Sequence, residues 1–426
     1  MLAKSHTKKN ICRLIYVAVF TVTELLTIFR NYIMKKSLLA LAVATIAASA
    51  NAATVYEKDG TSLTLDGRVQ SVFYSGNYSK AGENDSSLQN SGRFGIGGKT
   101  QITDWVAGIG YAQWDVADGS TDNFRARDQW VGADFGDFGK LQAGRLRDAA
   151  YFVEEVTDHY EDAADNLSGN FNGERRNGQL MYTYDNYGFH GQLGIQTAQD
   201  GVKVFKDKHK VFGLTDSYNV DSGFSTALGY TFDDVLFGPL GFRVGYSYLK
   251  GQKNGDVTDW SVDDGDVDFS SWSTFNKFKH ANASIVWGNL NSGLYLAALY
   301  DYAKFKGFGA YGGNSTRQET GRFDQFYDEN YKVKGVELAV GYAWENGISM
   351  LVGYEYAKYT SNDEGDVTSV KVKRIPVFVN YKINPNFNVW AEAGFNAGSD
   401  RKDIEENPLS KNVYRSVFSI GARYTF

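Results

Sequence analysis

The chain has 426 residues, a formal net charge of −6 and a single cysteine, and 15% of its residues are aromatic. The acidic balance argues against nucleic acid as a partner, and one cysteine excludes a disulfide-held scaffold. Many Gly, Tyr and Phe residues with only 4 Pro favour long, uninterrupted strands.

The first 52 residues predict a leader rather than part of the fold. From Met34 onward, MKKSLLALAVATIAASANA has a positive start, a short apolar run and a small-residue cleavage site, which is typical of a secretory signal peptide over residues 34–52. We interpret residues 1–33 as an upstream start-site extension, with a membrane anchor as the alternative. Residues 1–52 hold seven basic residues and one acid, so the formal charge of residues 53–426 is −12.

Residues 53–426 contain sixteen segments that alternate between apolar and polar side chains, as strands with two different faces do. Several connections are tight turns of Gly, Asn and Asp, such as 137–139 and 345–347, whereas others are long and polar. Short turns at one rim and long loops at the other are typical of hairpins arranged around a barrel. In chain order, the predicted strands are 61–75, 92–103, 105–116, 128–137, 139–145, 176–185, 187–198, 223–232, 240–251, 276–288, 291–305, 332–345, 347–360, 368–383, 386–397 and 412–426.

This pattern predicts an all-β fold, a 16-stranded antiparallel transmembrane β-barrel with short periplasmic turns and long extracellular loops. No stretch after residue 52 approaches the roughly 18 apolar residues of a membrane-spanning helix. A barrel accounts for the low overall hydropathy, because lipid-facing and lumen-facing residues alternate along each strand. A soluble sandwich is the alternative, but its apolar last strand would favour aggregation.

The last predicted strand, 412–426, ends on an aromatic residue. Phe418 and Tyr424 share one parity, and Arg423 has the other. We expect Phe426, with Tyr424 beside it, at the membrane edge, where aromatic rings form a girdle. Parity also predicts two tryptophans on the lipid face, Trp287 and Trp390.

Three stretches resemble the general porins of Gram-negative outer membranes. SLTLDGRVQSVFY (62–74), SGRFGIGGKTQITD (91–104) with GIGYAQWD (108–115), and RDQWVGADFGDFGKLQAGR (127–145) are similar to that family's first five strands, and the final Phe matches as well. The resemblance implies a homotrimer of sixteen-stranded barrels in the outer membrane, each a water-filled channel narrowed by an inward-folded third loop. It also implies that Phe426 and Tyr424 form a signal for the barrel-assembly machinery.

The resemblance further implies a channel constriction with a basic wall. Carried over by position, the basic side consists of Arg68, Arg93, Arg145 and Arg176. Alternation places the first two inward. Arg145 shares the parity of the apparently lipid-facing Leu141, so it reaches the lumen only if the strand ends or bulges at Gly144. Arg176 has the same conflict, and its neighbour Arg175 has the better parity.

The acidic side of the constriction is expected on the loop YFVEEVTDHYEDAAD, residues 151–165. This loop directly follows the matched fifth strand, so we expect it to fold inward, with a solvated surface loop as the alternative. It is shorter than in the enterobacterial members and lacks their Pro-Glu-Phe-Gly-Gly turn, which favours a wider constriction. Its candidate acids are Glu154, Glu155, Asp158, Glu161, Asp162 and Asp165.

These features predict a general diffusion channel without enzyme activity, cofactor or defined metal site. Ions and small hydrophilic solutes would pass a wet, charged constriction, with weak cation preference because the mature chain is acidic. Two unit charges 10 Å apart interact by about 0.4 kcal/mol in bulk water, so such charges bias permeation without forbidding either sign of ion.

Other functions remain open alternatives. A substrate-selective porin would carry a line of aromatic residues along the lumen, which the tryptophans do not form by parity. A barrel enzyme would need a nucleophile with an orienting base, and no GxSxG element precedes a helix. The acid-rich stretch 255–268 is interpreted as a surface that contacts lipopolysaccharide phosphates through divalent ions.

Overall fold

The computed structural model describes residues 52–78, 80–82, 85–116, 124–162, 175–203, 217–252, 260–263, 266–269, 275–311, 325–363, 366–399 and 415–426. Residues 1–33 and the predicted signal peptide, apart from its last residue, lie outside these ranges. No helix in the described ranges is long and apolar enough to cross a membrane.

Most described residues lie in strands, interrupted by the short helix α2 (Tyr151–Glu154) and the 3-10 turns η1 (Gly76–Tyr78) and η2 (Gly136–Phe138). The strands are β1 (Ala53–Lys58), β2 (Thr61–Tyr74), β3 (Ser87–Thr103), β4 (Val106–Val116), β5 (Phe124–Asp134), β6 (Lys140–Leu146), β7 (Arg176–Asn186), β8 (Phe189–Gln196), β9 (Gln199–Lys203), β10 (Ser217–Val235), β11 (Gly238–Gly251), β12 (Trp260–Asp263), β13 (Asp266–Phe269), β14 (Phe275–Asn289), β15 (Ser292–Tyr311), β16 (Gln325–Ala343), β17 (Ile348–Asp363), β18 (Asp366–Asn384), β19 (Phe387–Asn396) and β20 (Val417–Thr425).

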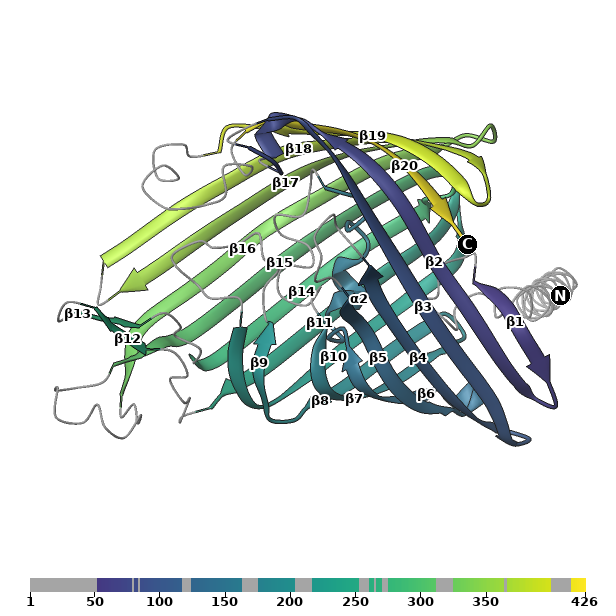
Figure 1. Ribbon diagram of the computed structural model, residues 1–426, viewed down its shortest axis with the longest axis horizontal. Helices are drawn as coiled ribbons and strands as arrows, with labels where there is room; N and C mark the ends of the chain where they lie inside the picture. The colour runs from purple at the N-terminus through teal and green to yellow at the C-terminus, as the bar shows by residue number, and fades with distance from the viewer. Residues whose placement is uncertain are drawn as a thin grey trace, which may run out of the picture. The chain divides into compact units, whose positions relative to one another are not determined.

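Sixteen of these strands close into an antiparallel barrel, which confirms the predicted fold (Figure 1). Closure occurs where β20 pairs with both β19 and β2, with Tyr424 opposite Val69. Phe426 continues this pairing through two backbone hydrogen bonds of 2.9 Å with Gly67, which has no side chain in the way of the Phe426 ring. Outside the sixteen, β1 pairs with β2, β9 pairs with β10, and β12 pairs with β13.

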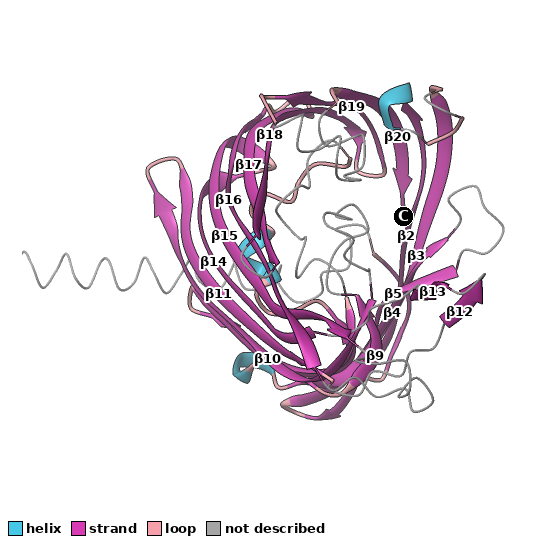
Figure 2. Cartoon of the chain, turned by 90° about the vertical axis from the view of Figure 1, so that its left-hand side faces the viewer, coloured by secondary structure: helices cyan, strands magenta, loops and turns pink. Residues whose placement is uncertain are grey.

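The two faces of each strand differ in burial, as alternation predicts. On β16, Val336, Leu338 and Val340 are 36% to 53% exposed and point away from the lumen, whereas Glu337 and Ala339 are buried. Apolar side chains on the outer face suit lipid, since the hydrocarbon interior of a membrane does not penalise them. The ring that the strands form is visible in Figure 2.

The short turns follow from residues that accept positive φ. The β7–β8 connection consists of Tyr187 and Gly188, whose φ angles are 55° and 77°. Two successive positive values match the type I′ turn, whose twist agrees with that of the flanking strands. The Asn186 side chain caps this turn by accepting a hydrogen bond from the Tyr187 N–H at 2.9 Å.

The inner wall is not polar throughout. At the long-loop ends of β9 to β18, apolar side chains on the inner face pack into one cluster in which every member is at most 4% exposed. Phe305 is central to it, with its ring 4.5 Å from Phe278 and 5.7 Å from Phe275. We call this set the inner apolar cluster: Val202, Tyr218, Val220, Leu249, Phe275, Phe278, Ala303, Phe305, Tyr331, Val333, Ala357, Tyr359, Val370 and Val372.

The prediction for Trp390 is wrong. Its side chain is only 3% exposed and lies on the inner face, with the Arg423 guanidinium 4.8 Å from its ring. The reason is Gly421, which stands directly opposite on β20 and leaves room for the indole. Trp287 has the outward parity of Ile285, and its Nε1 donates to the Val235 carbonyl at the short-turn rim.

Candidate channel constriction

The connection between β6 and β7 folds into the barrel, and α2 lies inside the ring of strands in Figure 2. We call its described part, residues 147–162, the inward loop. The loop starts at a buried ion pair, in which Arg176 of β7 binds the Asp148 carboxylate. Ser247 of β11 donates a further hydrogen bond of 2.8 Å to the same carboxylate. The first turn of the loop is thereby fixed to two parts of the wall.

The helix α2 is held against β11 and β14. The Asn282 side chain donates to the Ala150 carbonyl at 3.0 Å, just before the helix. Arg243 Nη1 lies 2.6 Å from both the Phe152 carbonyl oxygen and Glu155 Oε1, and its guanidinium stacks 4.0 Å from the Phe152 ring. One arginine therefore binds the helix through its backbone, a carboxylate and an aromatic face.

The rest of the inward loop crosses to β16 and β19. Thr157 Oγ1 donates to Glu337 Oε2 at 2.6 Å. Further on, the Glu392 carboxylate accepts the backbone N–H groups of Glu161 and Asp162 at 2.7 and 2.8 Å. Two N–H bonds to one carboxylate are strong because the acceptor is charged. The loop is thus attached to the wall along its described length.

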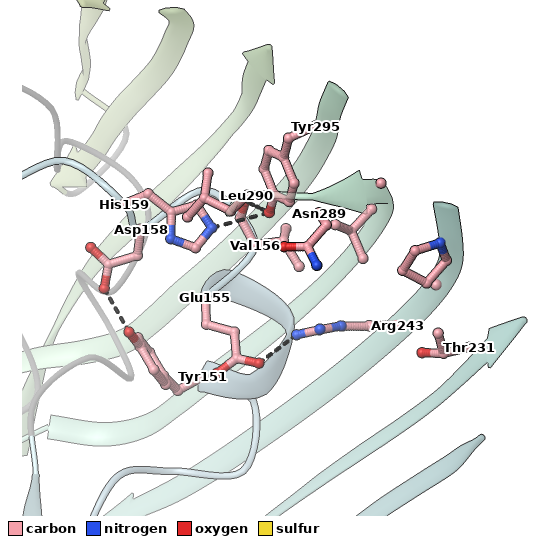
Figure 3. Close-up of a pocket in the computed structure, with 14 residues that line it drawn as sticks. Tyr151, Glu155, Val156, Asp158, His159, Thr231, Arg243, Asn289, Leu290 and Tyr295 are labelled. Atoms are coloured by element: carbon pink, nitrogen blue, oxygen red, sulfur yellow. Dashed lines mark hydrogen bonds and ion pairs between the residues drawn. The ribbon is translucent and has the colours of Figure 1, made fainter. Parts of the chain in front are cut away.

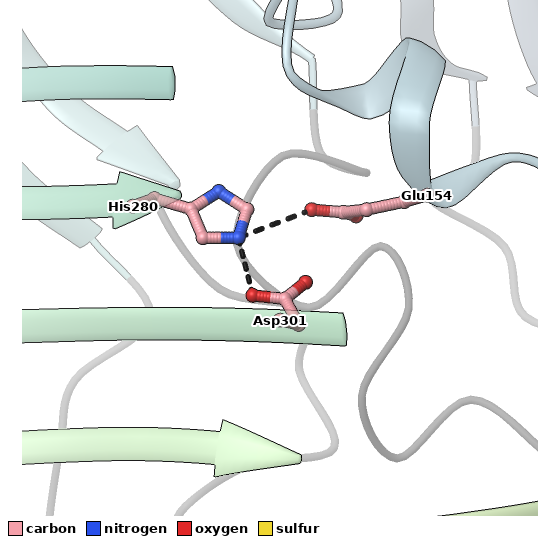
Figure 4. Close-up of side chains that lie close together, drawn as sticks. All are labelled: Glu154, His280 and Asp301. Atoms are coloured by element: carbon pink, nitrogen blue, oxygen red, sulfur yellow. Dashed lines mark hydrogen bonds and ion pairs between the residues drawn. The ribbon is translucent and has the colours of Figure 1, made fainter. Parts of the chain in front are cut away.

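A fully buried triad also ties α2 to the wall. His280 Nε2 lies 2.5 Å from Asp301 Oδ1 and 3.5 Å from Glu154 Oε1, and all three side chains have zero solvent exposure (Figure 4). A histidine and two carboxylates are also a donor set that a divalent cation uses. Because the same Nε2 atom already serves both carboxylates, we interpret the triad as an ion-paired anchor.

Opposite the inward loop, the wall from β2 to β5 carries arginines. Arg93 Nε and Arg127 Nη1 each lie 2.9 Å from a different oxygen of Asp115, so one carboxylate holds both guanidinium groups. Arg68 stands directly across from Arg93 in the β2–β3 register. It interacts electrostatically with Arg423, Arg93 and Arg127, and with the carboxylate of Glu161. Three arginines around one aspartate give this part of the wall an excess of positive charge.

Wall and loop meet at Arg423. Its Nη2 binds Glu161 Oε2 at 2.5 Å and its Nε donates to Gln70 Oε1 at 2.9 Å. Burial alone would raise the pKa of the Glu161 carboxyl, but Arg423, Arg68 and Arg93 bring it below its ordinary value of 4.5. Glu161 is therefore ionised at neutral pH and faces the basic wall.

A second group of charges lies where the inward loop leaves β6. The Arg147 guanidinium lies 3.6 Å from the Tyr151 ring, and the Tyr151 hydroxyl donates to Asp158 Oδ2 at 2.7 Å. Nearby, Arg175 binds Asp128 at 2.8 Å. Positive and negative groups therefore alternate along this edge of the loop.

The two arginines with a parity conflict have different surroundings, and Arg145 stays opposite Gln129 of β5 in the strand register. Arg145 Nε donates to the Arg127 carbonyl at 3.0 Å, after Gly144 takes a φ of 142° and the pairing with β7 shifts. Arg176 pairs with Leu146 on the far side of the same register shift, and Gly178 within the shifted stretch has a φ of 70°. Arg176, however, is only 2% exposed, so it anchors Asp148 rather than lining the channel. Arg175 retains a 13% exposed side chain.

The candidate acids have different surroundings. Glu154 is fully buried in the triad, so it cannot face the channel, contrary to its candidacy. Glu155 is 45% exposed beside Arg243, and Asp162 accepts from the Tyr74 hydroxyl at 3.0 Å. Asp158 and Glu161 lie beside Tyr151 and Arg423, as described above. Asp165 lies outside the described residues.

Sequence reasoning missed three arginines of this region: Arg127, Arg147 and Arg423. The alternation of the last strand already placed Arg423 on the polar face, so the sequence could have predicted that this side chain points inward. Arg127 lies in a bulge opposite β4, where the pairing shifts between Ala112 and Trp114. Simple alternation does not predict bulges of this kind.

A cavity of about 420 Å³ lies between the inward loop and the wall (Figure 3). Glu155, Asp158 and His159 line it from the loop, and Arg243 and Tyr295 line it from the wall. Burial lowers the pKa of His159 to about 4, so the ring is neutral at pH 7. The Tyr295 hydroxyl donates to the Val156 carbonyl at 2.7 Å and lies 3.0 Å from His159 Nε2.

Comparison with known proteins decides the family. Residues 38–401 match the family described as Gram-negative porin. This chain belongs to the Gram-negative porin family. It is 25% identical to outer membrane protein F of Serratia marcescens, over 92% of this chain and 100% of that protein, and 29% identical to outer membrane porin PhoE of Escherichia coli K12, over 82% and 93%. The solved structure of Salmonella typhi OmpF in complex with daunomycin has the same fold, with a TM-score of 0.62, 20% identity, and coverage of 88% and 100%.

Membership of the porin family places the protein in the outer membrane, which its barrel crosses many times. The porin is a channel protein and not an enzyme.

Proposed function

We propose that this porin is a general diffusion channel, which lets ions and small hydrophilic solutes cross the outer membrane passively with a weak preference for cations. One observation carries the proposal. The inward loop is attached to the wall from β11 to β20, and it holds Glu161 against Arg423 and near Arg68 and Arg93. We propose that the inward loop narrows the lumen without closing it.

The proposed constriction has a basic side of Arg68, Arg93, Arg145 and Arg175 and an acidic side of Glu155, Asp158, Glu161 and Asp162. Facing opposite charges set up a field across the channel, perpendicular to the path of a solute. This field orients dipolar solutes and disfavours large apolar ones. No conformational cycle is needed for passage.

Weak cation preference is proposed because the mature chain is acidic and because ion pairs neutralise part of the basic side. Asp115 pairs with Arg93 and Arg127, Asp128 with Arg175, and Glu161 with Arg423. Pairing leaves small residual charges, and these bias permeation severalfold at most.

We propose the further partners that the family resemblance implies. These are two other copies of the chain in a homotrimer, lipopolysaccharide in the outer leaflet, and the barrel-assembly machinery acting on Phe426 and Tyr424. Export is proposed to remove residues 34–52 as a signal peptide. Chemical cross-linking of the folded protein tests the trimer, and N-terminal sequencing of the mature protein tests cleavage after Ala52.

A substrate-selective porin is the second candidate, favoured by the cavity of about 420 Å³ beside the inward loop. A cavity of this size fits one small solute, with Arg243, Glu155 and Tyr295 as polar contacts. Bound solute there would block part of the ionic current.

Planar-bilayer conductance of the purified mature protein distinguishes the two candidates. A general porin gives large ohmic steps that close in thirds, with a small cation bias of the reversal potential under a salt gradient. Small steps that one added sugar blocks would indicate the selective porin. A folded, heat-modifiable barrel without conductance would contradict both.

A further inference from the structure

Rows of lysines cover one side of the barrel on its outer surface. They lie near the long-loop ends of β11 and β14 to β18, on the strand face opposite to the inner apolar cluster. Each is half-exposed or exposed, and each alternates with a buried inward residue, as Lys304 does with Ala303 and Phe305. We call this set the lysine belt: Lys250, Lys277, Lys279, Lys304, Lys306, Lys332, Lys334, Lys358 and Lys371.

The register places these lysines directly opposite one another. One row joins Lys250, Lys277 and Lys306 across three neighbouring strands. A second row joins Lys279, Lys304 and Lys332. The third joins Lys334, Lys358 and Lys371. Like charges directly opposite each other in a sheet are destabilising, so this arrangement calls for an anionic partner.

In the first two rows, the described residues provide an acidic partner to one of the six lysines. Lys250 pairs with Asp221 at 2.8 Å. Within the described ranges, the second row makes no ion pair, although Lys279, Lys304 and Lys332 all point outward. A charge lattice of this kind fits a ligand that brings several anionic groups at once.

The position of the lysine belt along the barrel axis indicates which layer of the membrane surrounds it. On β16, the outward residues between Lys334 and Tyr342 are Val336, Leu338 and Val340. The eight residue-to-residue steps from Lys334 to Tyr342 cover about 20 Å along the barrel axis at the usual strand rise and tilt. This length approaches the height of the apolar band of an outer-membrane barrel.

Tyrosines separate the belt from the apolar band on the alternate strands β11, β15 and β17. They include Tyr248, Tyr302 and Tyr356, each two positions from a lysine on the same face. Interfacial aromatic rings followed by lysines mark the transition from hydrocarbon to headgroups. The belt lies at the long-loop rim, which is the extracellular rim of the proposed channel.

The lysine belt has no counterpart among the described residues of β2, β3 and β4. Among the described residues, the outward positions at the same end of β2, β3 and β4 are occupied by Ser71, Asn90 and Trp114. General solubility at the extracellular rim would need no such asymmetry. The side without lysines remains available for contact with another copy of the chain.

We propose that the lysine belt binds the phosphate groups of the outer-leaflet glycolipid, lipopolysaccharide, along the side of the barrel formed by β11 and β14 to β18. This inference rests on the proposed outer-leaflet contact and specifies where it occurs. The multiply phosphorylated headgroup supplies the regularly spaced negative charges that the lysine rows require, and the acyl chains lie against the apolar band below.

The test compares two charge-matched variants of the refolded full barrel. The belt variant is Lys279→Gln/Lys304→Gln/Lys332→Gln, and the control is Lys58→Gln/Lys99→Gln/Lys382→Gln near the short-turn rim. The apparent dissociation constant for bisphosphorylated lipid A is measured in mixed micelles. We expect binding to weaken roughly fivefold for each lysine removed from the belt, and less than about twofold in total for the control. Equal affinities of the two variants would overturn the proposal.

Two further measurements identify the anion. Lipid A without phosphates is expected to bind wild type and belt variant equally weakly. Vesicles of phosphatidylglycerol are expected to discriminate much less between the variants than bisphosphorylated lipid A does, and equal discrimination would show a general anionic-lipid surface instead. The single variant Lys304→Gln repeats the test with a minimal change.

Two control measurements, the stability of the lipid-free protein and its conductance, separate loss of lipid binding from loss of the fold or of the channel. In lipid-free micelles, the belt variant is expected to unfold at the same or a higher urea concentration than wild type, because opposed like charges are removed. A lower midpoint would show that acids of this chain occupy the lysines, which contradicts the proposal. Conductance should be unchanged in both variants, so loss of lipid A binding with normal conductance supports the belt without testing the channel.

Discussion

Arg423 connects the two sides of the proposed constriction more directly than any predicted residue. It binds Glu161 of the inward loop, donates to Gln70 of β2, and covers the Trp390 ring. Replacing its charge therefore affects the field and the position of the loop end together, whereas Arg93 contributes through Asp115.

We predict that Arg423→Gln increases cation preference. Removal of one positive charge leaves Glu161 without its nearest counter-ion, and a charge about 10 Å from the path changes the energy of a monovalent ion by about 0.4 kcal/mol in water, or roughly twofold in the permeability ratio. The reversal potential under a salt gradient measures this change. Lys382→Gln near the short-turn rim is the control, and an equal shift in that variant would show that net charge alone is responsible.

Glu161 also makes the constriction sensitive to pH. The pKa of its carboxyl is lowered below 4.5, so its charge and its pairing with Arg423 are fully present above pH 4.5 and are lost as the pH falls through the lowered pKa. We predict a constant contribution to cation preference between pH 7 and 4.5 and a fall below that range. Comparing reversal potentials of wild type and Glu161→Gln isolates this contribution, and a difference that already disappears near pH 6 would contradict the assignment.

At the level of elements, two glycines explain where strand parity failed. Gly144 in β6 and Gly178 in β7 have positive φ values of 142° and 70°, and the register between these strands shifts beside them. Arg176 therefore turns toward the inner side, where it binds Asp148, although alternation assigns it to lipid. The shift delivers the chain from β6 into the inward loop.

We predict that Gly144→Ala destabilises the barrel by about 1–3 kcal/mol, because a side chain is strained at this φ and its Cβ would press on the Gln129 carbonyl oxygen. Urea unfolding in detergent micelles measures the effect. Gly98→Ala is the matched control, since a Cβ there meets nothing within 4 Å. A Gly144→Ala barrel as stable as the control would show that this conformation is not required.

The local sequence pattern was sufficient to predict the strands but not the course of the inward loop. The sixteen strands follow from alternation and from turn residues such as Tyr187-Gly188, which act over a few positions. The course of the inward loop depends on contacts across the lumen, such as Thr157 with Glu337 and Glu161 with Glu392, which are more than 150 residues apart. Arg68 and Arg93 were predictable because they lie in regular strand segments; the burial of Glu154 was not.

The molecule as a whole divides its inner wall into two kinds of surface. Charged and polar groups surround the inward loop, whereas the long-loop halves of β9 to β18 carry the inner apolar cluster, which has almost no contact with water. Alternation predicts which residues point inward but not that they are apolar there. Stability and conduction should consequently depend on different parts of the wall.

This separation gives a prediction with two matched variants. Phe305 has zero exposure and packs against Phe275 and Phe278, so Phe305→Ala should lower the free energy of unfolding by about 3–5 kcal/mol through lost packing. Its reversal potential and conductance should stay at wild-type values, because the ring does not border the water-filled path. Arg93→Ala should behave in the opposite way, with greater cation preference and a small loss of stability, since Asp115 retains Arg127. If Phe305→Ala instead shifted the reversal potential as much as Arg93→Ala in a folded barrel, ions would have to pass close to the inner apolar cluster. The conducting path would then not be confined to the space between the inward loop and the arginines of β2 to β5.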